Sequence, residues 1–232
     1  MKRETLAAIN AARREGRAIV RATDLATGDE RLIDPAADTS PLGLAAAGAA
    51  RADLSGPADI EGWPWFLSVY NPPLELVIVG AAHIAQPLAR MAREAGYGIR
   101  VIDPRTAFAT AQRFPDTTIS HDWPDEALAK APLGRRSAIV FLSHDPKIDD
   151  PGLVAALKSE CFYIGTLGSK KTQAARGARM RAAGFDDPAL ARMHGPVGLD
   201  IGAKSPAEIA ISILAEMTLV LRGRRGAAPP SP

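Results

Sequence analysis

The fold of this chain is decided by the stretch LVIVGAAHIAQPLARMAREAGYGIRVIDPR, which spans residues 76–105. It begins with Leu76–Val79, a continuous apolar run typical of a strand that is buried on both faces. Gly80 then permits a tight turn, residues 88–95 are expected to form a helix, and residues 99–102 read as a second strand. Strand, glycine turn, helix and strand in this order predict two parallel strands joined by a helical crossover.

The same alternation continues toward the C-terminus. Further strands are predicted at residues 117–120, 138–142 and 162–164, and helices at residues 124–130, 151–159, 170–183 and 207–221. The predicted fold class is therefore α/β, with a Rossmann-like, mostly parallel sheet that carries helices on both faces.

The N-terminal part of the chain does not show this alternation of strands and helices. Residues 1–62 predict a small α+β segment, with a helix at residues 4–15, a hairpin and then a linker rich in Ala, Gly, Pro and Asp that could hold one short helix around residues 42–50. Residues 63–225 are expected to form the Rossmann-like domain, with one further strand before Pro72 and Pro73. Residues 226–232 are expected to be a disordered tail.

The composition narrows the possible functions. The formal net charge is +2 and 23% of residues are charged, so no basic field points to nucleic acid as a partner. The single cysteine excludes an internal disulfide and a thiolate metal cluster, and no metal site is predicted. The chain begins without an apolar signal segment and has no run long enough to cross a bilayer. We therefore expect a cytoplasmic protein that does not enter a membrane.

The turn after the first strand is a modified dinucleotide fingerprint. Gly80 occupies the first glycine position, whereas Ala82 stands where a backbone approaches pyrophosphate, and His83 follows it. Asp103 ends the second strand, where a ribose-binding acid is expected, and Arg105 is placed to pair with a phosphate or with Asp103 itself. The pattern is a good indicator of the fold and a poor indicator of NAD binding.

The strand at residues 138–142 is followed by Ser143-His144-Asp145-Pro146-Lys147. A histidine and a carboxylate at the end of a buried strand favour contact with a ligand, where His144 could donate to a phosphate or exchange a proton. The alternative is that Asp145 caps the next turn and His144 has no ligand. We expect both to bind a cofactor.

The next strand is followed by GTLGSKKT at residues 165–172. Gly168 frees the backbone, Ser169 is a helix N-cap, and Lys170 and Lys171 lie in the first helical turn. Cations there oppose the helix dipole, so this segment predicts a site for an external anion. The arginines further along the helix are also consistent with a solvated basic face; they are Arg176, Arg179 and Arg181.

A glycine-rich loop precedes the last predicted helix. His194 opens this loop and is a further candidate for cofactor binding, whereas Ser205 and Glu208 form a capping box with a structural purpose. The helix itself is apolar on more than one side, which buries it in the core or against a second subunit. Cys161 opens a buried strand and is interpreted as core packing.

Five ordered motifs together resemble the XdhC/CoxI family over about residues 64–222. They are residues 76–105, residues 108–110 (FAT) with 113–115 (RFP), residues 143–146 (SHDP), residues 163–172 (YIGTLGSKKT) and residues 194–210 (HGPVGLDIGAKSPAEIA). The resemblance implies a Rossmann-like C-terminal domain in a maturation factor for molybdenum hydroxylases such as xanthine dehydrogenase or carbon monoxide dehydrogenase. Members of the family are described as binding molybdenum cofactor, protecting it during sulfuration and delivering it to the apoenzyme.

The resemblance therefore implies a cofactor-binding chaperone with no catalytic residue. Its cargo would be molybdopterin or the dinucleotide form, bound transiently, and its partners the large subunit of a hydroxylase and a cysteine desulfurase, with a homodimer as the expected assembly. Residues 1–62 are shorter than the usual N-terminal domain and hold no cysteine, which speaks against sulfuration by this chain alone. The alternatives are an NAD(P)-dependent oxidoreductase, for which no Tyr-x-x-x-Lys pair is found, and a nucleotide-binding adaptor.

Overall fold

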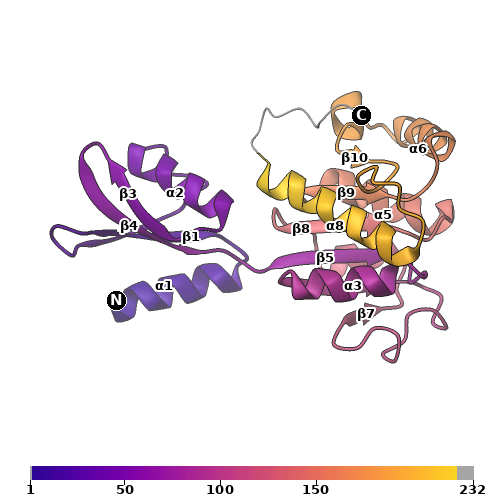
Figure 1. Cartoon of the computed structure of the whole chain (residues 1–232), viewed down its shortest axis with the longest axis horizontal. Coiled ribbons are helices and arrows are strands. Elements are labelled where there is room, and N and C mark those ends of the chain that lie inside the picture. Colours follow the sequence, from indigo (N-terminus) through magenta and orange to yellow (C-terminus); the bar gives the residue numbers. More distant parts are fainter. Residues whose placement is uncertain (1, 224–232) are drawn as a thin grey trace. The chain divides into compact units, whose positions relative to one another are not determined.

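The computed structural model describes residues 2–223 of the chain, which forms two compact units, Met1–Pro72 and Pro73–Pro232 (Figure 1). The division falls after residue 72, not after residue 62 as the sequence predicted. The reason is strand β4 (Trp63–Tyr70), which pairs with two strands of the N-terminal unit and so belongs to it. The predicted tail at residues 226–232 lies outside the described residues.

The N-terminal unit is an antiparallel sheet in the order β2-β1-β4-β3 with one helix on each face. In chain order its other elements are α1 (Arg3–Arg14), β1 (Ile19–Asp24), β2 (Glu30–Ile33), α2 (Pro41–Ala52) and β3 (Gly56–Ile60). Val20, Ala22 and Leu67 pack against helix α2, and Ile19 and Tyr70, on the opposite face, pack against helix α1.

The sequence predicted a linker over residues 34–62 that could hold a short helix around residues 42–50, and α2 confirms that helix. The linker prediction is wrong at residues 56–60, where β3 forms. Ser40 caps α2 by accepting a hydrogen bond from the N–H of Gly43. β3 has the sequence GPADI, which has little strand propensity, and it forms only because it pairs with β4 at the edge of the sheet.

The second unit is built on a six-stranded sheet in the order β10-β9-β8-β5-β6-β7, with every neighbouring pair parallel. This is the strand order of dinucleotide-binding folds and confirms the predicted fold class. Its strands are β5 (Leu74–Val79), β6 (Tyr97–Ile102), β7 (Thr118–Ser120), β8 (Ser137–Phe141), β9 (Tyr163–Thr166) and β10 (Met193–His194). Its helices are α3 (Ala85–Glu94), α4 (Pro124–Lys130), α5 (Pro146–Lys158), α6 (Lys170–Ala182), α7 (Asp187–Leu190) and α8 (Pro206–Arg222).

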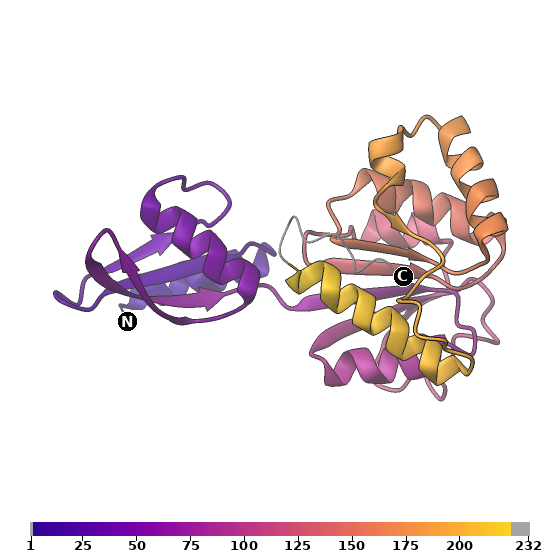
Figure 2. The ribbon, with the colours of Figure 1, turned by 45° about the horizontal axis from the view of Figure 1, so that its top comes forward.

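Helices cover both faces of this sheet (Figure 2). Leu76 and Ile78 point toward α3 and α8, whereas Val77 and Val79 point toward α4, α5 and α6. The alternation follows from the two-residue period of a strand, and it explains why β5 must be apolar at every one of these positions. Because helices cover both faces, we look for a ligand at the polar ends of the strands.

Three details of the second unit differ from the prediction. Helix α5 begins at Pro146 instead of Pro151, because Asp145 caps it and Pro146 occupies its first turn, while Pro151 lies inside the helix. α7 and the two-residue strand β10 were not predicted, since neither is long enough to show a hydrophobic period.

None of the described helices combines the length and the apolar character that spanning a bilayer requires.

Candidate ligand site at the carboxyl edge of the parallel sheet

The strand order changes direction at β5, since β6 lies on one side of it and β8 on the other. In open parallel sheets the loops that follow such a pair of strands part and leave a crevice at the carboxyl edge. Most of the residues predicted to bind a cofactor lie in the loops after β5, β6, β8 and β9, and the structure brings these loops to the same edge.

Gly80 allows the loops after β5 and β8 to lie close to each other. Its φ is +95°, and its N–H donates to the carbonyl of Ile102 at 2.9 Å. A Cβ atom added at Gly80 would lie 2.6 Å from the backbone nitrogen of Ser143, which is closer than real Cβ contacts. Only glycine therefore allows the loop after β5 to pass this close to the loop after β8.

The start of α3 offers unused hydrogen-bond donors. No side chain caps this helix, and within the described residues the N–H groups of Ala82, His83 and Ile84 have no acceptor. His83 is exposed and Ala82 is partly buried. Free N–H groups at the positive end of a helix favour a negatively polarised group of a ligand.

The carboxylate of Asp103 and the guanidinium of Arg105 pair with each other in the loop that follows β6. The Asp103 carboxylate accepts hydrogen bonds from Nε and Nη2 of Arg105, at 2.9 and 2.8 Å, and from the N–H of Ala81 at 2.8 Å. Burial alone would favour the neutral acid, but these hydrogen bonds hold the pKa of Asp103 below its ordinary value. Of the two partners foreseen for Arg105, the structure shows Asp103.

His144 and Asp145 have different environments. Asp145 caps α5 by accepting a hydrogen bond from the N–H of Lys147 at 2.9 Å, which is the structural alternative considered from the sequence. His144 is exposed and has a φ of +63°, in the left-handed region that non-glycine residues avoid. His144 thus combines backbone strain with exposure at the carboxyl edge of the sheet, where a ligand could reach its imidazole.

His144→Gly and His144→Ala separate backbone strain from the role of the imidazole. Glycine relieves the left-handed strain and alanine does not, so the glycine variant should be about 0.5–1 kcal/mol more stable than the alanine variant. Urea unfolding of the two purified variants measures this difference. If His144 contacts a ligand, both variants should lose affinity equally; an alanine variant that binds like wild type would exclude the imidazole from the site.

A buried ion pair behind the crevice escaped the sequence analysis. Arg176 on α6 lies 3.4 Å from Asp149 on α5, and both side chains are almost completely buried. Asp149 also accepts a hydrogen bond from the hydroxyl of Ser143 at 2.5 Å, and Arg176 donates to the carbonyl of Leu167 and the amide oxygen of Gln173. Burial raises the pKa of Asp149 in spite of these partners. The pair links the loops that follow β8 and β9.

Arg176 was interpreted as part of a solvated basic face, and this is wrong. A signal for the pair was present, because Asp149 lies on the apolar stripe of α5 with Gly152 and Leu153, and Arg176 lies with Gly177 and Met180 on the buried stripe of α6. A charge at such a position predicts a buried partner.

The other charges of α6 divide into two groups. Arg179 pairs with Asp150 at 2.5 Å and Arg181 with Asp187 at 2.9 Å. Lys170 and Lys171 are exposed in the first turn and form no ion pair with any residue between 2 and 223. Ser169 caps this helix by accepting from the N–H of Thr172, as predicted. Gly168, with a φ of +133°, lies in the loop between β9 and these two lysines.

His194 has internal partners. Its ring stacks on Tyr163 with centroids 4.7 Å apart, and Nδ1 lies 3.2 Å from Oε1 of Glu216 on α8. Glu216 also accepts from the hydroxyl of Tyr163 and from the N–H of Gly198. Although burial opposes ionisation, these hydrogen bonds together lower the pKa of Glu216. The cluster fastens β9, β10 and the glycine-rich loop to α8, and could not be foreseen from residues so far apart in sequence.

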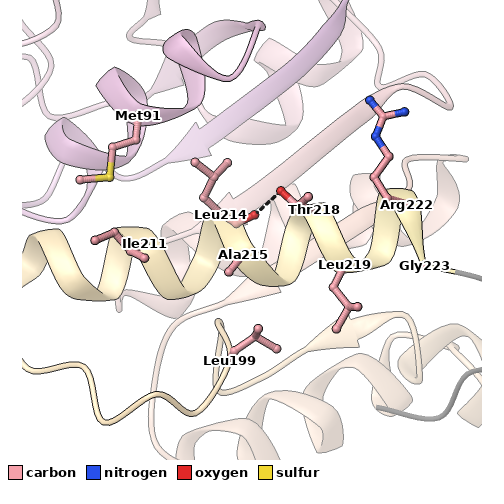
Figure 3. Close-up of a pocket in the computed structure, with 9 residues that line it drawn as sticks. All are labelled: Met91, Leu199, Ile211, Leu214, Ala215, Thr218, Leu219, Arg222 and Gly223. Atoms are coloured by element: carbon pink, nitrogen blue, oxygen red, sulfur yellow. Dashed lines mark hydrogen bonds between the residues drawn. The ribbon is translucent and has the colours of Figure 1, made fainter. Parts of the chain in front are cut away.

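An apolar groove of about 770 Å³ is lined by residues of α3, of α8 and of the loop before α8 (Figure 3). Met91 of α3 faces it, and α8 contributes a row of side chains with the exposed Ile211 and Leu219 among them. The outer face of α8 is thus open on the isolated chain, although its inner face is buried at Ala210, Ile213 and Met217. The groove residues are Met91, Leu199, Ile211, Leu214, Ala215, Thr218, Leu219, Arg222 and Gly223.

Comparison with known proteins gives consistent matches. The family model described as the XdhC Rossmann domain matches residues 76–217. A probable xanthine dehydrogenase subunit of Bacillus subtilis (strain 168) is 31% identical over 154 residues, which are 66% of this chain and 44% of that protein. "Molybdenum cofactor insertion chaperone PaoD" of Escherichia coli (strain K12) is 29% identical over 151 residues, 65% of this chain and 41% of that protein.

A solved structure matches both units of the chain. It is described as a xanthine dehydrogenase from Bacillus halodurans and superposes with a TM-score of 0.68 and 26% identity, covering 98% of this chain and 67% of that one. The matched region spans less than half the length of the curated relatives.

Proposed function

This chain belongs to the XdhC family, and from that membership we propose that it is a maturation factor that carries molybdenum cofactor to a molybdenum hydroxylase. The cofactor is cargo that the chain binds and releases, and no residue is assigned a catalytic role. A relative named as a molybdenum cofactor insertion chaperone and another named as a probable xanthine dehydrogenase subunit support this proposal.

The observation that carries the proposal is the pair of free lysines at the start of α6. The three arginines of this helix have carboxylate partners, whereas Lys170 and Lys171 have none among the described residues. Their charges repel the positive end of the helix on which they lie. A phosphate bound in front of the helix would remove that repulsion and accept hydrogen bonds from both ammonium groups.

The remaining residues fit a cargo that combines a phosphate with a polar ring system. Gly168 and Ser169 would shape the phosphate loop, and the unpaired N–H groups of Ala82 and His83 would face the cargo from the loop after β5. His144 would contact the ring system. The sequence also predicted Asp103, Asp145 and His194 as ligands, but their roles here would be structural. Asp103 would position Arg105, Asp145 would cap α5, and His194 would hold the glycine-rich loop against α8.

Cys161 supports a carrying role over a sulfur-transferring one. Its side chain is buried, and burial raises the pKa of its thiol, so little thiolate forms. Sulfuration of the cargo would then need a separate cysteine desulfurase. The open outer face of α8 is where we would place the second copy of a homodimer.

The proposal is tested by co-expression with the large subunit of a molybdenum hydroxylase. Affinity capture of the tagged chain should retain that subunit, and the captured material should release the fluorescent oxidation product of molybdopterin. The same capture from cells that cannot synthesise molybdopterin is the control. A chain that retains neither pterin nor hydroxylase, yet is stabilised by NADH in a thermal-shift assay, would instead be the oxidoreductase alternative.

A further inference from the structure

We propose that Arg105 determines the specificity of the crevice by binding a neutral pair of ring acceptors, an oxygen and an adjacent nitrogen, and that it excludes ligands recognised through a ribose diol. The inference rests on the proposed function and extends it, because it concerns which end of the ligand lies on the β6 side. It begins with what Asp103 can no longer do.

Asp103 has no acceptor left for a ligand. A carboxylate offers about four acceptor positions. In Asp103, Oδ1 accepts from the N–H and Nε of Arg105, and Oδ2 accepts from the N–H of Ala81 and Nη2 of Arg105. The residue is 0% exposed. An acid at the end of this strand normally accepts hydrogen bonds from the ribose hydroxyls of NAD, and here that function is blocked.

Arg105 has donors left. Nε and Nη2 face Asp103, whereas Nη1 forms no hydrogen bond with any of the described residues. The side chain is 38% exposed, and its guanidinium lies over the ring of Phe108 at 4.7 Å, which fixes its plane. Nη1 and the second hydrogen of Nη2 thus form an open fork that can donate two parallel hydrogen bonds.

Charge decides between a phosphate and a neutral acceptor pair at this fork. The hydrogen-bonded carboxylate of Asp103, and at longer range those of Asp145 and Asp149, raise the pKa of Arg105. A doubly charged phosphate would be repelled by the same three carboxylates, whereas a neutral ring would not. The phosphate is then expected at Lys170 and Lys171, and the ring at Arg105.

The ring acceptors that suit such a fork are known chemically. Arginine binds the O6 and N7 atoms of guanine with two parallel hydrogen bonds, and adenine cannot replace it because it presents a donor in place of O6. A pterin also places an oxygen beside a ring nitrogen, at O4 and N5, and N5 of the reduced ring keeps a lone pair although it carries a hydrogen. GMP and AMP are therefore matched probes, since they share ribose and phosphate and differ only in the base.

Calorimetric titration of the full chain with GMP, AMP and NADH tests the inference. Wild type should bind GMP about tenfold more tightly than AMP. Arg105→Met removes every donor of the fork, so it should bind the two equally, and Arg90→Met, on the exposed side of α3, should keep the preference. The thermal midpoint of each variant verifies folding.

Three results would overturn the inference: equal affinity of wild type for GMP and AMP, no binding of GMP, or a preference that survives Arg105→Met. Tighter binding of NADH than of GMP by wild type would show that a ribose diol is recognised after all. A chain that retains molybdopterin in the capture experiment but shows any of these results refutes the role of Arg105 alone. A chain that retains no molybdopterin refutes the proposed function.

Discussion

Arg176→Met should lower the free energy of unfolding by about 3–5 kcal/mol. The substitution leaves the carboxylate of Asp149 buried, without its ion-pair partner, and still hydrogen-bonded to Ser143. Arg181→Met is the matched control, because Arg181 lies on the same helix and forms an exposed pair with Asp187. Loss of an exposed pair costs about 0–1 kcal/mol. Urea unfolding of the two variants at pH 7 measures the difference.

The penalty should also depend on pH. Burial already raises the pKa of Asp149, and removal of Arg176 should raise it further. A carboxyl group whose pKa is higher in the folded state favours folding while it is protonated, and this contribution is lost as the pH rises through that pKa. The deficit of Arg176→Met should therefore be smaller in mildly acidic solution than at pH 8. A deficit that is independent of pH, or equal to that of Arg181→Met, would contradict a charged buried pair.

The double variant Lys170→Ala, Lys171→Ala should bind molybdopterin at least about a hundredfold more weakly. Each charge-assisted contact with a phosphate contributes about 1.5–3 kcal/mol, and tenfold in affinity corresponds to about 1.4 kcal/mol. Its stability should rise, by about 0.3–1 kcal/mol, because the positive end of α6 no longer carries two cations. Weaker binding together with higher stability is the signature of residues kept for a ligand.

Lys158→Ala is the control for this experiment. Lys158 is exposed in the last turn of α5, at the end of the helix that is remote from the carboxyl edge of the sheet. Its removal should leave affinity unchanged. Fluorescence titration with molybdopterin, together with a crystal soaked in phosphate, examines both points. Unchanged affinity of the double variant, with no anion at the start of α6, would reject the phosphate site.

The central part of the fold could be predicted from sequence because its signals are local. The apolar run Leu76–Val79 can only be a strand buried on both faces, Gly80 is required by its left-handed backbone, and Ser205 with Glu208 forms the capping box that begins α8. Each signal lies within a few residues. The alternation of strands and helices then fixed the class of sheet, and the structure confirms it.

The missed features depend on contacts between distant segments. Asp149 and Arg176 are 27 residues apart, and His194 and Glu216 are 22 apart, so their pairing follows from how crossover helices pack and not from any motif. β3 was missed for a different reason, since its sequence GPADI has little strand propensity and it forms by pairing with β4, the next strand along the chain. The pairing of Arg105 is a different case, because the sequence had left two partners open, a phosphate and Asp103, and the structure shows Asp103.

The only cysteine, Cys161, is 4% exposed, so a second cysteine introduced at the surface can be labelled selectively with a fluorescent dye. A maleimide reacts with thiolate at the surface, and Cys161 offers little of it. A cysteine introduced at the exposed Ala174, one turn beyond the lysines of α6, would accept a single dye without removal of the native residue. Its emission would then follow loading and unloading of the crevice in real time.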